Sequence, residues 1–257
     1  MSEDPTRRFS RRVEYYVKYR PGYPEAVLTC LQRECGLTKT AVIADIGSGT
    51  GLLTRLFLQH GNPVYAIEPN DEMRRASEQF LAKFPNVTIV NGRAEATTLP
   101  DQSVDFITAG QAFHWFDHKA ARQEFQRILR PGGFVVLVWN SRHEGASPFM
   151  QALEAFNRHY GQNYQRVREP GRRKDALAAF FNGRFQVREF SNEQIFDFEG
   201  LKGRKLSASY IPLPDHPDYP AMIENLKQIF DRYQENGFVR FQYITRLFYG
   251  QLSPVPS

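Results

Sequence analysis

A buried-strand pattern that runs directly into a glycine-rich turn is the most constraining feature of this chain. The segment Val42 to Ile46 is apolar apart from Asp45, and glycines follow at positions 47, 49 and 51. Glycine lets the backbone approach a ligand where a side chain would block it, and leucines at helical spacing from position 52 predict that the turn opens a helix. An ordinary strand-to-helix turn needs fewer glycines and no acidic residue. The pattern therefore favours a nucleotide-type pocket beside the first strand of a parallel sheet.

The spacing of the glycines indicates which class of nucleotide the turn binds. A dinucleotide fingerprint needs a small third residue at position 52, and that position is Leu52. No lysine follows the turn as it does in a phosphate-binding P-loop. A nicotinamide oxidoreductase is therefore only a third hypothesis.

The G-x-G-x-G spacing after an acidic residue resembles the first motif of the class I S-adenosylmethionine-dependent methyltransferases. The resemblance implies S-adenosylmethionine as cofactor and S-adenosylhomocysteine as its product. It also implies cofactor contacts from Asp45, Gly47, Ser48, Gly49 and Gly51.

A second strand is expected over residues 63–68, with Glu68 at its carboxyl end. In a doubly wound sheet, an acidic residue about 20 positions after the glycine turn accepts hydrogen bonds from ribose hydroxyls, and Glu68 has this position. The alternative is a carboxylate that caps the helix beginning near Asn70. The resemblance places Pro69, Asn70 and Met73 beside the adenine.

Two later segments extend the resemblance. After a third strand over 86–90, Ala94 and Glu95 match the family's residues near the adenine edge. A fourth strand over 105–109 is followed by polar and aromatic residues at the carboxyl edge of the sheet, where ligands bind. Of these, Gln111 and Ala112 are expected to contact the cofactor.

The amino-terminal segment contains a Y-x-x-Y-R-P-x-Y-P pattern from Tyr16 to Pro24. It resembles the start of a small-molecule branch of the family that includes trans-aconitate methyltransferase-like proteins. The resemblance implies that Arg20 pairs with the methionine carboxylate and that Tyr16 and Tyr19 lie near the sulfonium. The alternative is that the aromatic side chains pack against the core and only hold this segment in place.

We expect a single α/β domain over 1–257, with a doubly wound, Rossmann-like seven-stranded sheet. The resemblance implies the strand order 3-2-1-4-5-7-6, mostly parallel with an antiparallel last strand. The expected parts are a cofactor-covering segment over 1–24, a cofactor-binding core over 25–140, a helical lid over 147–182 and closing elements over 183–257. Within the last part we expect strands over 185–190, 193–198 and 238–249, and helices over 200–210 and 219–234.

The residues after the fourth strand narrow the class of methyl acceptor. An N-P-P-Y-like motif, typical of enzymes that methylate nucleic-acid amino groups, is missing there, and no Pro-Cys pair for pyrimidine methylation occurs. A small-molecule acceptor, a carboxylate or a hydroxyl, is therefore favoured. The net charge of +5 and the basic residues of 158–174 keep RNA methylation as the alternative, although this cluster and Arg7, Arg8, Arg11 and Arg12 are most simply solvated surface.

His114 is the candidate general base, because it follows the fourth strand at the ligand edge. The alternative is a structural histidine packed among the neighbouring aromatic residues, and a carboxylate acceptor would need no base. Trp115 and Tyr210 are candidate substrate contacts, as are Ser207 and Ser209. A protein that binds S-adenosylmethionine without catalysis is a separate hypothesis, because a glycine turn predicts the pocket and not the reaction.

The two cysteines, Cys30 and Cys35, do not form a C-x-x-C pair, so neither a zinc site nor a disulfide scaffold is indicated. The amino terminus lacks the apolar segment of a signal peptide, and no run approaches the roughly 18 apolar residues of a membrane span. These patterns favour a cytoplasmic protein, a monomer or homodimer, with no membrane partner and no metal.

Overall fold

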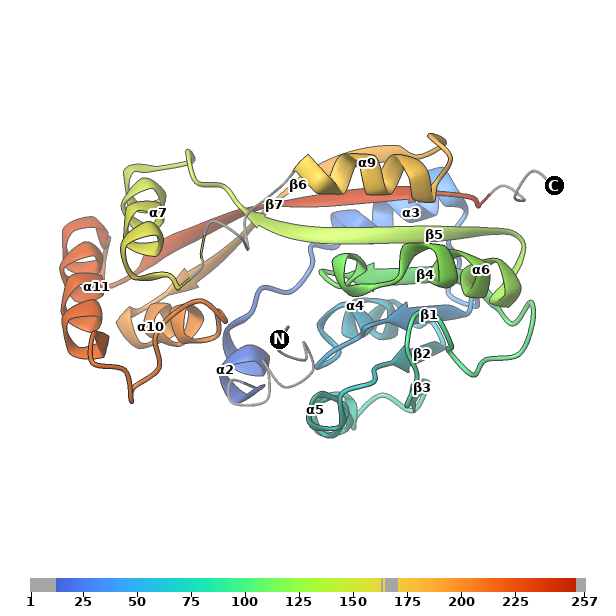
Figure 1. Cartoon of the computed structure of the whole chain (residues 1–257), viewed down its shortest axis with the longest axis horizontal. Helices are drawn as coiled ribbons and strands as arrows, with labels where there is room; N and C mark the ends of the chain where they lie inside the picture. Colours follow the sequence, from blue (N-terminus) through green and yellow to red (C-terminus); the bar gives the residue numbers. More distant parts are fainter. Residues whose placement is uncertain (1–12, 163, 165–170, 253–257) are drawn as a thin grey trace.

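The computed structural model describes residues 13–162, 164 and 171–252. These residues form a seven-stranded sheet of order β3-β2-β1-β4-β5-β7-β6 (Figure 1). The strands are β1 (Ile43–Ile46), β2 (Val64–Ile67), β3 (Val87–Val90), β4 (Val104–Gly110), β5 (Leu129–Arg142), β6 (Gln186–Phe196) and β7 (Val239–Gly250). Strands β1 to β5 pair in parallel, and β7 is antiparallel to both β5 and β6. The predicted doubly wound sheet and its strand order are confirmed.

Helices cover both faces of this sheet. The buried side chains of β5, which point alternately to the two faces, show why. Val136 and Val138 pack with α3 (Ala26–Cys35) and α4 (Leu52–His60) on one face. Val135 and Leu137 pack with α6 (His118–Ile128) and α9 (Gly171–Phe180) on the other. Because successive side chains of a strand point to opposite faces, a continuous apolar run is buried between two helical layers.

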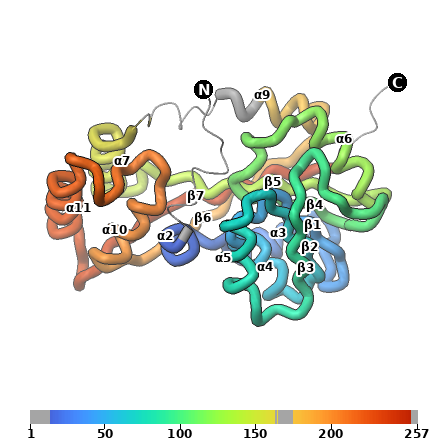
Figure 2. The backbone as a smooth tube through the Cα atoms, turned by 60° about the horizontal axis from the view of Figure 1, so that its bottom comes forward, coloured from blue at the N-terminus to red at the C-terminus, as the bar shows by residue number. Residues whose placement is uncertain are grey.

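A third apolar cluster lies beyond this sandwich, where β6 and β7 extend past the other strands. It contains α7 (Pro148–Tyr160), α10 (Phe198–Leu206) and α11 (Tyr219–Tyr233), with buried Met150, Leu201, Leu226 and Phe241. Figure 1 shows these helices at the left end, away from β1 to β4, with α2 (Val13–Tyr19) between the two parts. The tube view of Figure 2 gives the same arrangement, with α2 beside α5 (Asp71–Leu81). The fold therefore has a sheet core and a helical end joined by the long strands β5, β6 and β7.

The segment expected as one lid, 147–182, is divided between these two parts. Helix α7 belongs to the helical end, whereas Leu177 and Phe180 of α9 are buried against the sheet. Arg122 of α6 donates a hydrogen bond from Nε to the Phe180 carbonyl oxygen at 2.8 Å. Helix α9 therefore packs as a core helix, where the sequence led us to expect part of a lid.

The closing elements differ from the expected ones at their boundaries. A single strand, β6, replaces the two expected over 185–190 and 193–198, and α10 replaces the helix expected over 200–210. The polar pair Ser191 and Asn192 does not end the strand, because both residues stay in register with β7 and Asn192 donates from Nδ2 to the Gly22 carbonyl oxygen. Across the described parts of the chain, no helix has the length and apolar character needed to cross a membrane.

Candidate cofactor site

The glycine turn after β1 has the backbone geometry that its sequence predicts. Gly47 and Gly49 have φ angles of 64° and 57°, in the left-handed region that disfavours residues with a side chain. A Cβ atom at Gly47 would lie 2.7 Å from the Ala112 Cβ, whereas one at Gly49 would enter open space. The Gly47 and Ser48 N–H groups donate to the Ile67 carbonyl oxygen at 2.8 and 3.1 Å. The turn is thus fixed to β2, with its open side toward a cavity.

Glu68 connects the end of β2 to this turn. Its Oε2 accepts a hydrogen bond from the Gly49 N–H at 2.9 Å, and its Oε1 accepts one from the Asn70 N–H at 2.9 Å. The side chain is 8% exposed, and burial raises its pKa from the ordinary value. The helix cap itself is Asn70, whose Oδ1 accepts from the Met73 N–H. Glu68 is therefore a buried carboxylate whose remaining acceptor capacity faces the cavity.

A cavity of about 590 Å³ lies at the carboxyl ends of β1, β2 and β4. This size is typical of small-molecule and cofactor sites. Twelve of its lining residues are expected site residues: Tyr16, Gly47, Gly49, Glu68, Pro69, Asn70, Met73, Ala94, Glu95, Gln111, Ala112 and Trp115. Four others were not expected from the sequence: Arg93, Gly110, Phe116 and Asp117. Each of the four lies within two positions of an expected residue. Nearness in sequence to the expected residues could therefore have predicted them.

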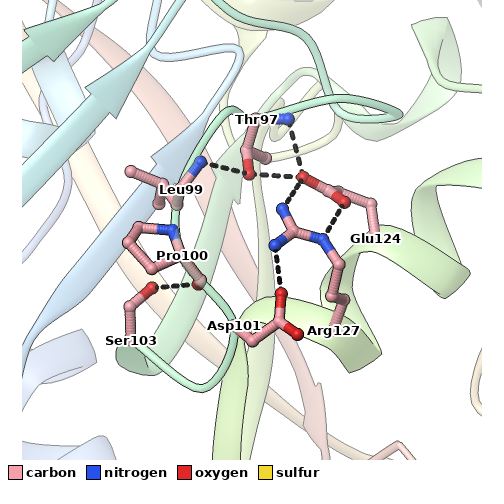
Figure 3. Close-up of polar contacts among 7 residues, drawn as sticks. All are labelled: Thr97, Leu99, Pro100, Asp101, Ser103, Glu124 and Arg127. Atoms are coloured by element: carbon pink, nitrogen blue, oxygen red, sulfur yellow. Dashed lines mark hydrogen bonds and ion pairs between the residues drawn. The ribbon is translucent and has the colours of Figure 1, made fainter.

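The loop between β3 and β4 carries Ala94 and Glu95 into the cavity wall and is held from behind by α6. Glu124 Oε1 accepts hydrogen bonds from the Thr97 N–H at 2.8 Å and from the Thr97 hydroxyl at 2.5 Å (Figure 3). Arg127 donates to both Glu124 oxygens and to Asp101.

Two further bonds tighten the same loop. The Leu99 N–H donates to the Thr97 hydroxyl oxygen, and the Ser103 hydroxyl donates to the Pro100 carbonyl oxygen, as Figure 3 shows. Burial acts to raise the pKa of Glu124, but the hydrogen bonds from Arg127 and Thr97 prevail and lower it to about 2. An ionised Glu124 thus fixes the loop behind the cavity wall.

The end of β4 forms the opposite wall. Gln111 has a φ of 61°, a conformation that costs free energy for a residue with a side chain and is common at functional sites. Its N–H donates to the Val138 carbonyl oxygen, and its Nε2 donates to the Asn140 carbonyl oxygen at 2.9 Å. Gln111 is therefore bonded to β5 through both its backbone and its side chain.

A short helix, η1 (Phe113–Trp115), follows Gln111 and contains two candidate residues, His114 and Trp115. Trp115 lines the cavity and is 46% exposed. His114 is exposed, lies beside the Trp115 ring at 4.7 Å between centroids, and is not among the cavity-lining residues. The alternative, a histidine packed among the neighbouring aromatic residues, is met in part by the Trp115 contact, in a side chain that is exposed. The assignment of His114 as a base stays a prediction without support from this position.

Helix α2 and the residue after it carry the three amino-terminal candidates, and only Tyr16 reaches the cavity. Tyr19 packs against α10, where a Cβ at Gly203 would lie 2.2 Å from its ring. Arg20 stacks over the Tyr16 ring at 4.8 Å and donates from Nη2 to the Ser207 carbonyl oxygen at 2.8 Å. Tyr19 therefore lies outside the cavity lining and Arg20 adjoins it through Tyr16, so the contacts of both residues with the cofactor stay predictions. The missing side chain of Gly203 explains why Tyr19 turns away.

Asp45 lies beneath the glycine turn, outside the cavity lining. Its Oδ2 accepts from the Thr54 hydroxyl at 2.6 Å, and its Oδ1 accepts from the Thr108 hydroxyl at 2.8 Å. The carboxyl group is fully buried, and burial raises its pKa to about 6. Asp45 thus joins β1, α4 and β4 and has no surface toward a ligand.

Five other expected residues are also absent from the lining: Ser48, Gly51, Ser207, Ser209 and Tyr210. Ser48 contributes its N–H to the turn, and a Cβ at Gly51 would lie 2.7 Å from the Leu81 side chain of α5. Tyr210 is buried in the helical end, where its hydroxyl accepts from Arg142 at 2.7 Å. The basic positions Arg7, Arg8, Arg11, Arg12, Arg166 and Arg168 lie outside the described residues, as do the side chains of Arg172, Arg173 and Lys174.

The sheet order and a cavity at its carboxyl edge beside a glycine turn define a class I methyltransferase fold. Residues 44–137 match the family model described as a methyltransferase domain. An uncharacterized methyltransferase of Schizosaccharomyces pombe is 36% identical over 137 residues, which are 53% of each chain. One of Mycobacterium tuberculosis is 37% identical over 136 residues, again 53% of each. The chain spans about half the length of the curated relatives it matches.

Solved structures agree on the fold across most of the chain. A putative type II methyltransferase from Anaeromyxobacter dehalogenans has a TM-score of 0.71 at 20% identity, covering 92% of this chain and 100% of that one. A putative methyltransferase from an antibiotic biosynthesis pathway of Anabaena variabilis has a TM-score of 0.60 at 22% identity, covering 92% and 99%. Residues 44–137 are therefore similar to a methyltransferase domain, and the likeness to methyltransferase folds extends beyond this segment.

Proposed function

We propose that this protein transfers a methyl group from S-adenosylmethionine to a small-molecule acceptor. The observation that carries the proposal is Glu68, a buried carboxylate that is bonded to the Gly49 N–H and lines the cavity. In doubly wound folds, a carboxylate in this position binds the ribose hydroxyls of a nucleoside cofactor. A nucleoside can approach the turn because Gly47 and Gly49 have no side chain there.

The rest of the cavity wall fits the same cofactor. Pro69, Met73 and Ala94 supply apolar surface for a purine ring, and Glu95 supplies an acceptor beside it. The wall also contains the carboxylates of Glu68, Glu95 and Asp117 against the single guanidinium of Arg93. An excess of negative charge suits a ligand with a sulfonium and an ammonium group.

When bound, S-adenosylmethionine supplies a methyl group on a positively charged sulfur, which an acceptor displaces directly. The residues of this chain have to hold the acceptor in line and exclude water, and positioning of this kind contributes about 7–11 kcal/mol to catalysis. Tyr16 on α2 and Trp115 on η1 line the cavity from different elements and can cover a bound ligand. Because His114 is exposed and outside the lining, the proposal gives it no catalytic role.

A small-molecule acceptor is favoured over RNA by the size of the site, a cavity of about 590 Å³. Of the basic segment over 158–174, Arg158 is described with its side chain, and its Nε is paired with Glu154 at 3.0 Å. RNA binding would instead show a steep loss of affinity with added salt, which a titration at two salt concentrations measures.

The experiment that tests the proposal is calorimetric titration with S-adenosylmethionine and with a nicotinamide dinucleotide. We expect the first alone to bind the wild-type protein. Glu68→Gln should raise its Kd about 10- to 100-fold, because hydrogen bonds to a charged group contribute about 1.5–3 kcal/mol. Glu72→Gln is the matched control, since Glu72 is an exposed carboxylate on the first turn of α5, and it should leave the Kd unchanged. Equal affinities of the two variants, or absence of binding, would refute the proposal.

A further inference from the structure

The segment that carries Tyr16 to the cavity is held in place by amide side chains of the long strands. This segment, the strap, comprises residues 13–24, which are α2 and the extended residues after it. Figure 1 shows α2 between the sheet core and the helical end. Gln194 of β6 donates from Nε2 to the Tyr19 carbonyl oxygen at 3.2 Å. Side chains outside the cavity lining thus set the position of the strap.

The firmest attachment of the strap is at Gly22 and Tyr23. The Gly22 carbonyl oxygen accepts hydrogen bonds from Asn140 Nδ2 at 3.0 Å and from Asn192 Nδ2 at 2.9 Å. The next residue packs against the end of β4, where a Cβ atom at Gly110 would lie 2.5 Å from the Tyr23 hydroxyl oxygen. The strap therefore passes directly beside the strand end from which Gln111 follows.

Asn140 of β5 connects this attachment to the cavity wall. Its carbonyl oxygen accepts from Gln111 Nε2 at 2.9 Å, while its own Nδ2 donates to Gly22. Its Oδ1 accepts from the hydroxyl of Thr245, the fully buried residue paired with it on β7, at 2.5 Å. Since the oxygen of the amide faces a donor, its nitrogen is turned to the strap. Asn140 is not in the cavity lining, so it acts through its neighbours.

The strand order indicates which end of the cofactor Gln111 faces. Glu68, Met73 and Ala94 follow β2 and β3, so the proposed nucleoside position is at these strands. In the order β3-β2-β1-β4, Gln111 lies on the other side of β1. A cofactor whose nucleoside is at β2 therefore extends its amino-acid end toward Gln111.

We propose that Asn140 is a positioning residue that couples the strap to the amino-acid end of the cofactor site. This inference rests on the proposed function. Gln111 has a φ of 61°, and a residue in such a conformation has to be held by its surroundings. One asparagine supports both Gln111 and the strap, so the two have a fixed position relative to each other. Removal of its amide releases the Gly22 carbonyl and weakens the support of Gln111.

The first test compares two ligands that share a nucleoside. S-Adenosylhomocysteine has an amino-acid group, and methylthioadenosine lacks it. Asn140→Ala should raise the Kd for S-adenosylhomocysteine about fivefold or more and change that for methylthioadenosine by less than about twofold, because the lost hydrogen bonds support one end of the site. An unchanged affinity for S-adenosylhomocysteine, or an equal loss for both ligands, would overturn the proposal.

A second variant tests the coupling with Asn140 in place. Thr245→Val removes the hydroxyl that orients the amide and leaves a side chain of similar shape. It should weaken binding of S-adenosylhomocysteine in the same direction as Asn140→Ala and to a smaller extent. Where Asn140→Ala does not fold, Thr245→Val decides by itself, and an affinity equal to that of the wild type would count against the coupling.

Asn62→Ala is the matched control for lost stability. Asn62 is fully buried, and its Nδ2 donates to the carbonyl oxygens of Thr38 and Ala41 at 2.8 Å each. It precedes β2 and is not in the cavity lining. We expect this variant to lower the Tm as Asn140→Ala does and to leave both Kd values unchanged. Equal losses of affinity in the two variants would show a general effect of stability and refute the positioning role.

Limited proteolysis measures the attachment of the strap without any ligand. Lys18 is exposed on α2, and trypsin does not cleave after Arg20 because Pro21 follows. Cleavage after Lys18 is identified by mass spectrometry as a fragment that begins at Tyr19. It should be several-fold faster in Asn140→Ala than in Asn62→Ala, because local opening of the strap then costs less free energy. Equal cleavage rates would contradict the attachment.

The titrations also separate this proposal from the proposed function. A wild-type protein that binds S-adenosylhomocysteine, with an affinity that neither Asn140→Ala nor Thr245→Val changes, refutes the positioning role and leaves the proposed function standing. A wild-type protein that binds neither nucleoside refutes the proposed function and the positioning role together, whatever the rate of cleavage after Lys18.

Discussion

The backbone N–H of Gly49 donates a hydrogen bond to the Glu68 carboxylate at 2.9 Å, and this bond fixes the glycine turn to the end of β2. Gly49 lies in the turn between β1 and α4, Glu68 follows β2, and both residues line the same cavity. The carboxylate is thus held in position before any ligand arrives, so little ordering free energy is needed on binding.

Replacement of Gly49 by alanine tests whether the open side of the turn is a binding surface. Gly49 and Gly36 both have a positive φ, and an added Cβ would enter open space at either position, so either alanine should cost about 1–2 kcal/mol of unfolding free energy. Gly36 ends α3 and is not in the cavity lining. We expect only Gly49→Ala to raise the Kd for S-adenosylmethionine. Equal Kd values for the two variants in calorimetry would show that the turn does not contact the cofactor.

Asp45 should make stability depend on pH in a specific direction. Burial raises its pKa to about 6 in the folded state, so folding is favoured when the group is protonated. This contribution is fully present below the unfolded pKa of about 3.9, and it is lost as the pH rises to about 6. A shift of this size corresponds to about 3 kcal/mol.

The comparison that isolates this effect is urea unfolding of the wild type and Asp45→Asn between pH 4 and pH 7. Asparagine cannot ionise, so the variant should gain stability relative to the wild type by up to about 3 kcal/mol as the pH rises over this range. A difference that stays constant with pH would contradict the raised pKa.

Glu124 should show the opposite dependence, because its pKa is lowered to about 2. Its stabilising contribution is present above the unfolded pKa of about 4.3 and is lost as the pH falls toward 2. Glu124→Gln should therefore cost about 1.5–3 kcal/mol at pH 7 and much less at pH 3. It should also weaken cofactor binding, since the loop that Glu124 holds through Thr97 also contains Glu95, which lines the cavity. Asp101→Asn, at the exposed end of the same network, should have a small effect on both.

His114 and Trp115 provide a test of which neighbouring aromatic side chain contacts the ligand. Both are exposed, but only Trp115 lines the cavity. We expect His114→Ala to leave the Kd for S-adenosylmethionine within about twofold, and Trp115→Ala to raise it about two- to tenfold through loss of a ring contact. The reverse order of effects in the same titration would place the binding surface on the other side of η1.

The sheet and the core of the cavity were predictable because they depend on local patterns in fixed order. The glycine turn, Glu68 and the Ala94–Glu95 pair each follow a strand, and the carboxyl ends of parallel strands meet at one edge. Their mutual placement therefore follows from strand order alone, which the structure confirms.

The errors arise where distant elements decide the position of a side chain. Tyr19 turns to α10 because Gly203 leaves room for its ring, and nothing near Tyr19 in the sequence indicates this. Asp45 is buried because Thr54 and Thr108 reach it from α4 and β4. The neighbouring cations Arg20, Arg142, Arg204 and Lys205 were also missed, since they come from separate segments, after α2, at the end of β5 and on α10.

The most direct test of the central claim is a crystal structure of the protein with S-adenosylhomocysteine. We predict the ribose hydroxyls within hydrogen-bonding distance of Glu68, the adenine between Met73 and Ala94, and the amino-acid end beside Gly47 and Gly49. A nucleoside found elsewhere, or an empty cavity at saturating concentration, would contradict the proposed cofactor site.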